Sequence, residues 1–363
     1  MWKEVDVEVA KQQIIKDQMK FDAQDKFFEY FEQICNQELD RTKPLFQFRL
    51  IEDYTEDTSM VMFLCPHAFC DGIAVSSIFS AINDDQFSCP HKKKMFYPSL
   101  IQKIILFFKT PFTNVSLEGK VDLIKTDDNT KQIFKLKRQV PTMTKYYDSE
   151  IDFPFSTIRK CYQKYKGMSF NDFMLGIFGK SIYQYCIKKG IKNPNNVKCE
   201  IPVGLKKLPT GYHDLVVKNY LNASVLDLPL SEDMEQIMNG FKPWLSYCLD
   251  PEIQKQVINF THLVPYIPQG FAKSEINNSS KGVDVLLSNI PFSDKPYTIC
   301  GKEVKKFRIF NNTMLGIVLY GFVFTYANKV CVTTCVDERI DFDGQMFQDL
   351  MIKNIQIEVD NLK

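Results

Sequence analysis

Residues 65–72 of the chain have the sequence Cys-Pro-His-Ala-Phe-Cys-Asp-Gly. This stretch follows an apolar run and precedes a helical pattern, so it predicts a strand, a tight turn and a helix in that order. A histidine at a strand end can face a cleft while its backbone is held. Because imidazole titrates near neutrality, His67 can accept a proton from a hydroxyl group. We predict that Asp71 caps the helix that follows and that Gly72 lets the chain turn sharply.

The same residues also have a plainer interpretation. A single histidine ahead of a helix is commonly a surface or capping residue, and Asp-Gly is a common turn dipeptide. From the local sequence alone, His67 is a candidate general base, and a purely structural role for residues 65–72 is the alternative.

The sequence around residues 65–72 predicts a mixed α/β fold. Upstream, apolar residues at helical spacing predict a helix over residues 9–38. Two apolar runs follow, at 46–52 and 59–65, and the polar segment 53–57 between them predicts a β-hairpin.

Downstream, residues 83–136 are irregular, which indicates a linker or crossover. Strands and helices then alternate to the end of the chain, without a repeat at a fixed period. The expected strands are 146–155, 197–203, 220–228, 283–288, 304–310, 315–326 and 330–337, and the expected helices are 156–166, 170–189, 231–249 and 343–362. A length of 363 residues suggests two domains or one large fold of two parts.

Composition excludes several functional classes. Lys and Arg number 45 and Asp and Glu 44, a balance that gives no case for nucleic-acid binding, because phosphate binding needs a basic surface.

The eleven cysteines include no C-x-x-C pair, and Cys65 and Cys70 lie in apolar segments, where cysteine behaves as a small hydrophobe. The charged start, residues 1–6, lacks the apolar region of a signal peptide, so we expect thiols in an intracellular, reducing compartment. None of the four histidines pairs with cysteine at zinc-ligand spacing, so we expect no metal site.

Residues 96–112 are the nearest approach to a membrane segment. They are shorter than the ~20 apolar residues that a spanning helix needs, and Pro98 and Pro111 interrupt them. With the basic run 92–94 ahead of them, they fit either a core helix or an interfacial helix on a membrane. The second alternative would make the protein peripheral on the endoplasmic reticulum or another organelle membrane.

Several motifs together resemble one known family. The His-x-x-x-Asp-Gly pattern resembles the CoA-dependent acyltransferase superfamily, and the whole set is most similar to the wax ester synthase/diacylglycerol acyltransferase family of bacteria and plants. The motifs keep that family's order from about residue 39 to the C-terminus. They are Leu-Asp-Arg-Thr-Lys-Pro-Leu-Phe at 39–46, His-Ala-Phe-Cys-Asp-Gly at 67–72, Met-Ser-Phe-Asn-Asp at 168–172, Ile-Pro-Val-Gly-Leu-Lys at 201–206, Lys-Asn at 218–219, Leu-Ser-Asn-Ile-Pro at 287–291, and the hairpin residues 301–304 and 320–337.

The resemblance implies an α/β fold of two chloramphenicol-acetyltransferase-like subdomains. Each would be a mixed sheet flanked by helices, with a tunnel between them. The subdomains would be residues 1–145, shortened at the front and including the crossover, and residues 146–363. The resemblance further implies that His67 is the base that activates an acceptor hydroxyl, and that Asp71 and Gly72 hold the loop in shape.

The resemblance also implies substrates. The protein would move a fatty acyl group from acyl-CoA to a lipid alcohol, either a long-chain alcohol or diacylglycerol, with CoA as a substrate and no cofactor. Ser288 and Asn289 are the candidates for substrate contacts. Judged from its neighbours alone, Asn289 is equally a plain turn residue, and Asn171 and Asp172 are predicted to cap a helix.

Two other interpretations stay open. One is an acyltransferase of the same superfamily that acts on a small alcohol or amine. The other is an inactive acyltransferase-like protein that serves as a structural or interaction subunit of a larger assembly. The short segment ahead of His67 and the departure at 289–292, where Phe292 replaces the family's glycine, favour an inactive protein. The intact His67, Asp71 and Gly72 oppose it.

Overall fold

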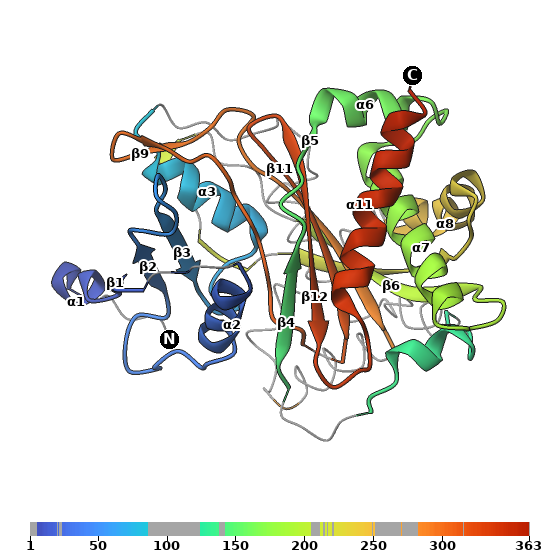
Figure 1. The fold of residues 1–363 in the computed structure, drawn as a ribbon, viewed down its shortest axis with the longest axis horizontal. Coiled ribbons are helices and arrows are strands. Elements are labelled where there is room, and N and C mark those ends of the chain that lie inside the picture. Colours follow the sequence, from blue (N-terminus) through green and yellow to red (C-terminus); the bar gives the residue numbers. More distant parts are fainter. Residues whose placement is uncertain are drawn as a thin grey trace, which may run out of the picture. The chain divides into compact units, whose positions relative to one another are not determined.

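The computed structural model describes residues 6–19, 21, 24–85, 124–137, 142–204, 211–212, 215, 217–219, 221–248, 250, 270, 282–314 and 316–362. The chain forms two compact units: Met1–Val75 with Val216–Tyr220, and Ser76–Leu215 with Leu221–Lys363. Each unit contains helices and a mixed sheet, so the predicted mixed α/β class is confirmed (Figure 1). The subdomain boundary predicted between residues 145 and 146 stays a prediction, and residues 96–112 lie outside the described residues.

The first unit is a three-stranded sheet with short helices. Its elements are α1 (Val7–Lys11), β1 (Ile14–Asp17), α2 (Gln24–Cys35), β2 (Gln47–Ile51), β3 (Met60–Leu64) and the first residues of α3 (Gly72–Ile82). The strand order is β1-β2-β3, with β1 parallel to β2 and β2 antiparallel to β3. The predicted hairpin is therefore confirmed, with Ile51 opposite Met60 at its closed end.

The single helix predicted over residues 9–38 is wrong. Strand β1 lies between α1 and α2, and it pairs with β2 in parallel register. Asp17 at its end accepts hydrogen bonds from the Arg49 guanidinium at 2.8 and 2.9 Å and from the Tyr30 hydroxyl at 2.5 Å. Burial raises the pKa of Asp17, but these hydrogen bonds outweigh it and hold the pKa below its ordinary value. Pairing with a distant strand has overridden the local helical spacing.

The second unit is built on one large sheet. Its elements are the 3-10 helix η2 (Thr130–Phe134), β4 (Thr144–Asp148), β5 (Phe153–Pro154), α6 (Phe155–Gln163), α7 (Phe170–Lys188), β6 (Asn196–Gly204), β7 (Leu221–Pro229), α8 (Met234–Cys248), β8 (Val285–Pro291), β9 (Thr298–Ile299), β10 (Lys302–Glu303), β11 (Leu319–Tyr326), β12 (Lys329–Asp337) and α11 (Gly344–Asp360). The strand order is β4-β12-β11-β8-β6-β7, with β5 also paired to β12. Strand β8 is parallel to both β11 and β6, and the other pairs are antiparallel, so the sheet is mixed. Figure 1 shows α7, α8 and α11 on one side of this sheet.

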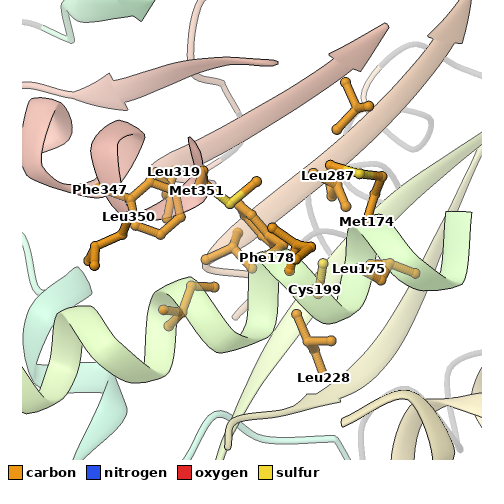
Figure 2. Close-up of a cluster of buried hydrophobic side chains, with 14 of the residues drawn as sticks. Met174, Leu175, Phe178, Cys199, Leu228, Leu287, Leu319, Phe347, Leu350 and Met351 are labelled. Atoms are coloured by element: carbon orange, nitrogen blue, oxygen red, sulfur yellow. The ribbon is translucent and has the colours of Figure 1, made fainter. Parts of the chain in front are cut away.

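The main core lies between those helices and the sheet (Figure 2). The ring of Phe178 in α7 meets that of Phe347 in α11 edge to face, at 5.7 Å between centroids. Leu287 of β8 and Leu319 of β11 pack against them from the sheet. Gly321 of β11 allows this close approach, because a Cβ there would lie 2.9 Å from both Phe178 Cε2 and Leu287 Cδ1. Burying one such side chain contributes roughly 1.5–3 kcal/mol.

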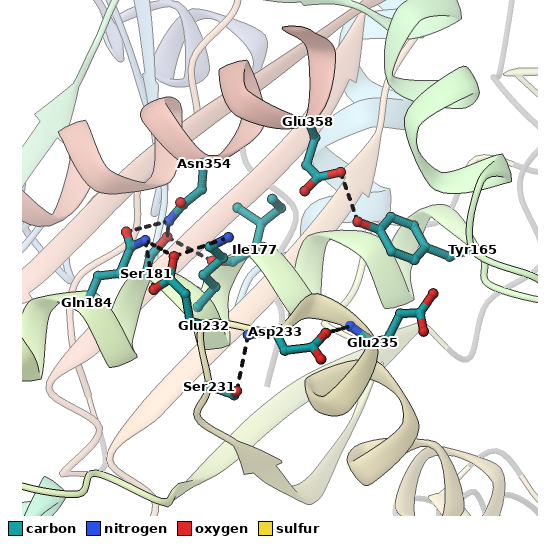
Figure 3. Close-up of polar contacts among 11 residues, drawn as sticks. Tyr165, Ile177, Ser181, Gln184, Ser231, Glu232, Asp233, Glu235, Asn354 and Glu358 are labelled. Carbon is teal, nitrogen blue, oxygen red and sulfur yellow. Dashed lines mark hydrogen bonds and ion pairs between the residues drawn. The ribbon is translucent and has the colours of Figure 1, made fainter. Parts of the chain in front are cut away.

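Buried polar contacts fix the position of α11 (Figure 3). The Asn354 amide is 1% exposed and donates to Ser181 Oγ and Gln184 Oε1, both in α7, at 3.0 Å each. Nearer the C-terminus, Glu358 accepts from the Tyr165 hydroxyl at 2.9 Å. Because buried polar groups need specific partners, these bonds select one register of α11 against its neighbours.

The strand predicted over residues 304–310 is wrong. This segment contacts the sheet through side chains: Phe307 packs on Tyr326 of β11 with ring centroids 5.7 Å apart. The carbonyl of Ile309 accepts from the hydroxyl of Thr333 in β12 at 2.6 Å, so a side chain supplies the hydrogen bond that a backbone N–H would supply between paired strands.

The described part of the chain contains no helix with the length and apolar character of a membrane span.

Candidate active site

The turn after β3 carries His67. The backbone N–H of Phe69 donates to the carbonyl of Pro66 at 2.8 Å, which closes a turn over residues 66–69 directly after the strand. His67 is partly exposed in this turn. The order of strand, turn and helix that the sequence predicts is therefore confirmed.

Asp71 joins the turn to α3. Its Oδ1 accepts from the backbone N–H of Ala74 at 2.8 Å, and its side chain is buried. The Asp71 carbonyl accepts from the N–H of Val75 at 2.9 Å, which is the first bond of the helix. The predicted cap is confirmed, because a carboxylate here satisfies a backbone donor that the helix leaves open. Gly72 is the first residue of α3, and its part in a sharp turn of the chain stays a prediction.

A segment from far along the chain reaches this turn. Residues Val216–Tyr220 belong to the same compact unit. The side-chain amide nitrogen of Asn219 is 3.1 Å from Nδ1 of His67. Beside it, the carbonyl of Lys218 accepts from the backbone N–H of Asp71 at a long 3.4 Å. Asn219 therefore contacts one ring nitrogen of the candidate base.

This contact can select the tautomer of His67. If the amide NH2 faces Nδ1, then Nδ1 accepts and Nε2 carries the hydrogen. If the amide is rotated so that its oxygen faces Nδ1, then Nδ1 carries the hydrogen and Nε2 has a free lone pair. The second arrangement makes Nε2 a base, in the way that a partner at one ring nitrogen commonly prepares the other.

The contact of Asn219 with His67 was not predicted from the sequence. Lys-Asn at 218–219 is a motif of the family resemblance, without a role assigned to either residue. Asn219 and His67 are 152 positions apart, and no local pattern pairs residues at that separation. The family resemblance at 218–219 was the one signal that pointed to this segment.

Ser288 and Asn289, the other candidates, lie in strand β8 of the second unit. The interpretation of Asn289 as a turn residue is wrong, because β8 continues to Pro291 and Asn289 stands opposite Val323 of β11. Its side-chain NH2 donates to the side-chain oxygen of Asn171. Ser288 is buried. Two asparagines from separate motifs thus join β8 to the start of α7.

At the start of α7, only one of the two predicted capping residues, Asn171 and Asp172, caps the helix. The Asp172 carboxylate accepts from the backbone N–H of Ser169 at 2.7 Å, and Ser169 Oγ accepts from the N–H of Asp172 at 3.3 Å. This reciprocal capping box confirms capping by Asp172. Capping by Asn171 is wrong: its side chain bonds to Asn289 instead.

The first unit can therefore support proton transfer at His67. The imidazole is partly exposed, its turn is held by a hydrogen bond and a capped helix, and a side-chain amide contacts Nδ1. In the described part of the chain, no group of three or more His, Cys, Asp and Glu side chains is placed to hold a metal ion. Ser288 and Asn289 belong to the second unit, and their part in substrate binding stays a prediction.

Family models match two parts of the sequence. Residues 23–102 match the wax ester synthase/diacylglycerol acyltransferase catalytic domain, and residues 253–357 match the WS/DGAT C-terminal domain. The first match includes His67, and the second includes β8. A search of curated proteins finds no match to the sequence.

Solved structures show the same fold. The wax ester synthase/diacylglycerol acyltransferase from Marinobacter aquaeolei VT8 aligns with a TM-score of 0.62 and 11% identity, over 99% of this chain and 81% of that chain. The EpoB cyclization-docking bidomain from Sorangium cellulosum aligns with a TM-score of 0.57 and 11% identity, over 95% and 69%. The epimerization domain from the third module of tyrocidine synthetase B aligns with a TM-score of 0.53 and 11% identity, over 96% and 80%. The predicted fold class is confirmed by these likenesses, which at such identity concern the fold alone.

Proposed function

Because the chain belongs to the wax ester synthase/diacylglycerol acyltransferase family of acyltransferases, we propose that it moves a fatty acyl group from acyl-CoA to a lipid alcohol, either a long-chain alcohol or diacylglycerol. His67 is the general base in this proposal. The observation that supports it most is the placement of the partly exposed His67 in the turn between β3 and α3. The proposal takes the Asn219 side-chain amide in the rotated arrangement, with its oxygen accepting from Nδ1–H, because only that arrangement leaves Nε2 free to act as a base. CoA is a substrate here, and the proposal needs no cofactor.

In the proposed reaction, His67 carries one proton from the acceptor alcohol to the leaving CoA thiolate. Nε2 takes the hydroxyl proton as the alcohol oxygen attacks the thioester carbonyl. The new C–O bond forms, the C–S bond breaks, and the proton passes from His67 to the departing CoA thiolate. General base catalysis of this kind contributes about 10²–10⁴-fold, and the placement of the two substrates supplies much of the rest.

Acyl transfer is tested with a labelled long-chain acyl-CoA and a panel of fatty alcohols and diacylglycerol. We expect ester from the wild type and a rate about 10²–10⁴-fold lower from His67→Ala. His91→Ala removes a histidine outside the motif and is the matched control, with wild-type rate expected. Ester formation by His67→Ala at the wild-type rate would place the base elsewhere. No ester from the folded wild type with any acceptor would leave the inactive, structural subunit as the better interpretation.

Asn219 acts as a positioning residue in this proposal. Asn219→Ala should lower kcat more than it raises KM, because the ring loses its orientation while the substrate contacts remain. Asn219→Asp should restore part of the rate, since a carboxylate at Nδ1 also favours the tautomer with a free Nε2. The ¹⁵N chemical shifts of the labelled His67 ring report that tautomer directly. An unchanged ring spectrum in Asn219→Ala would remove Asn219 from the mechanism.

Membrane contact and compartment are part of the same proposal. We propose that residues 96–112 hold the protein on an intracellular organelle membrane, with the basic run 92–94 toward anionic headgroups. Deletion of residues 96–112 should release the protein from sedimenting anionic vesicles. Unchanged sedimentation of a folded deletion variant would contradict this.

A further inference from the structure

Two cysteines lie on either side of His67. Cys65 directly follows β3, and Cys70 precedes the capping residue Asp71. Their Sγ atoms are 3.3 Å apart. Cys70 is 3% exposed, whereas Cys65 is partly exposed. Their apolar neighbours in the sequence predict two small hydrophobic residues, but the fold of the turn places the two thiols in direct contact.

We propose that Cys65 and Cys70 are a modification site, where a reversible disulfide closes the loop that carries His67. A disulfide needs its sulfurs about 2.05 Å apart, so the two sulfurs must approach by roughly 1.2 Å. The bond between Phe69 and Pro66 already folds the segment between the cysteines, so small side-chain rotations can bring the sulfurs together. The closure is thus within reach of the folded protein.

The two thiols are suited to different steps of the exchange. A hydrogen bond from the Cys70 thiol lowers the pKa of Cys65, although burial acts to raise it. Cys65 is also the more exposed residue of the two. Because the thiolate is the attacking species, Cys65 should react first and Cys70 should resolve the intermediate.

The oxidant is a small disulfide of the class of oxidised glutathione. The Cys65 thiolate attacks one of its sulfurs, the S–S bond breaks, and one glutathione thiolate leaves. The Cys70 sulfur then attacks the sulfur of Cys65 in the mixed disulfide, and the second glutathione leaves. Two protein thiols are oxidised, one glutathione disulfide is reduced to two thiols, and the two thiol protons end on the glutathiones.

Closing this loop should displace His67, an effect that rests on the proposed function. His67 lies two residues after Cys65 and three before Cys70, inside the closed loop. Catalytic groups must be held within about 0.5 Å of their working position, and a misplacement of about 1 Å can cost 10²-fold in rate. We therefore expect the oxidised protein to transfer acyl groups at least about ten-fold more slowly than the reduced protein.

Peptide mapping tests the disulfide without any activity assay. The full chain is held in mixtures of reduced and oxidised glutathione, quenched in acid, alkylated and cut with chymotrypsin. Cleavage after Phe69 separates Cys65 from Cys70 unless a disulfide joins the two peptides. We expect the joined pair to become the major species as oxidised glutathione increases and to disappear with dithiothreitol. Separate alkylation of the two cysteines, or glutathione adducts alone at every ratio, would overturn the proposal.

The activity arm compares the same samples with two variants. Cys65→Ser cannot form the disulfide, so its transfer rate should not respond to oxidised glutathione, and a thermal unfolding curve checks that it folds. Cys300→Ser removes an exposed thiol in the turn between β9 and β10, and it should stay as sensitive as the wild type. A joined pair with an unchanged transfer rate would refute the effect on His67. A joined pair in a protein that makes no ester even when reduced would leave the disulfide standing and remove the proposed function.

Discussion

We predict that the buried carboxyl group of Glu200 makes the free energy of unfolding fall as pH rises. It lies in β6 of the large sheet, opposite Leu286 of β8 and Val225 of β7, and is 7% exposed. Burial raises the pKa of its carboxyl group from 4.5 to about 7. The folded protein therefore favours the neutral carboxylic acid, whereas the unfolded chain does not.

The size and sign of the effect follow from the two pKa values. A pKa difference of one between the folded and unfolded states is worth about 1.36 kcal/mol. The rise of the Glu200 pKa from 4.5 to about 7 in the folded protein therefore corresponds to about 3 kcal/mol. Because the folded pKa is the higher one, the stabilisation is full below the unfolded pKa and is lost as pH rises through the folded pKa. Between pH 5 and pH 8 the loss should be about 2.5 kcal/mol.

Glu200→Gln isolates this contribution. Glutamine has nearly the same shape and does not titrate, so the other titrating groups cancel when the two proteins are compared. We expect the free energy of unfolding of the wild type, measured in urea, to fall by about 2.5 kcal/mol relative to the variant between pH 5 and pH 8. Glu303→Gln, which removes an exposed carboxylate in β10, is the control and should run parallel to the wild type. Parallel curves for the wild type and Glu200→Gln would refute the reasoning.

Three further substitutions test the packing and the capped turn, each by urea unfolding. Gly321→Ala should lower the free energy of unfolding by about 1–3 kcal/mol, since its Cβ would press on Phe178, and an unchanged midpoint would contradict that close contact. Asp71→Ala should cost about 1 kcal/mol through loss of the bond to Ala74, while Asp71→Asn should keep most of it; equal losses in both variants would argue against capping. Asn354→Ala should cost about 1–3 kcal/mol because it leaves the buried Ser181 and the partly exposed Gln184 without the amide donor, and a neutral result would show that water replaces the amide.

Local sequence patterns predicted the helices, hairpin and turn that are held together by residues close to one another in the sequence. The hairpin of β2 and β3 follows from two apolar runs around a polar turn, and α7 follows from the helical pattern predicted over residues 170–189. Part of the turn of His67 belongs to the same group, because the bond of Phe69 to Pro66 and the cap of Asp71 on Ala74 lie within ten residues of one another. Family order then extended these local signals to a fold class that the structure and its likenesses confirm.

The features that were not predicted from the sequence depend on residues that are distant along the chain. Strand β1 exists because it pairs with β2, and Asp17 is 32 positions from the Arg49 that it binds. The contact of Asn219 with His67 spans 152 positions, so no periodicity or cap could have indicated it. The identity and order of the residues made His67 the candidate base, and that role stays a prediction. The tertiary fold selected its neighbours, because contacts across the chain form only when the whole unit is packed.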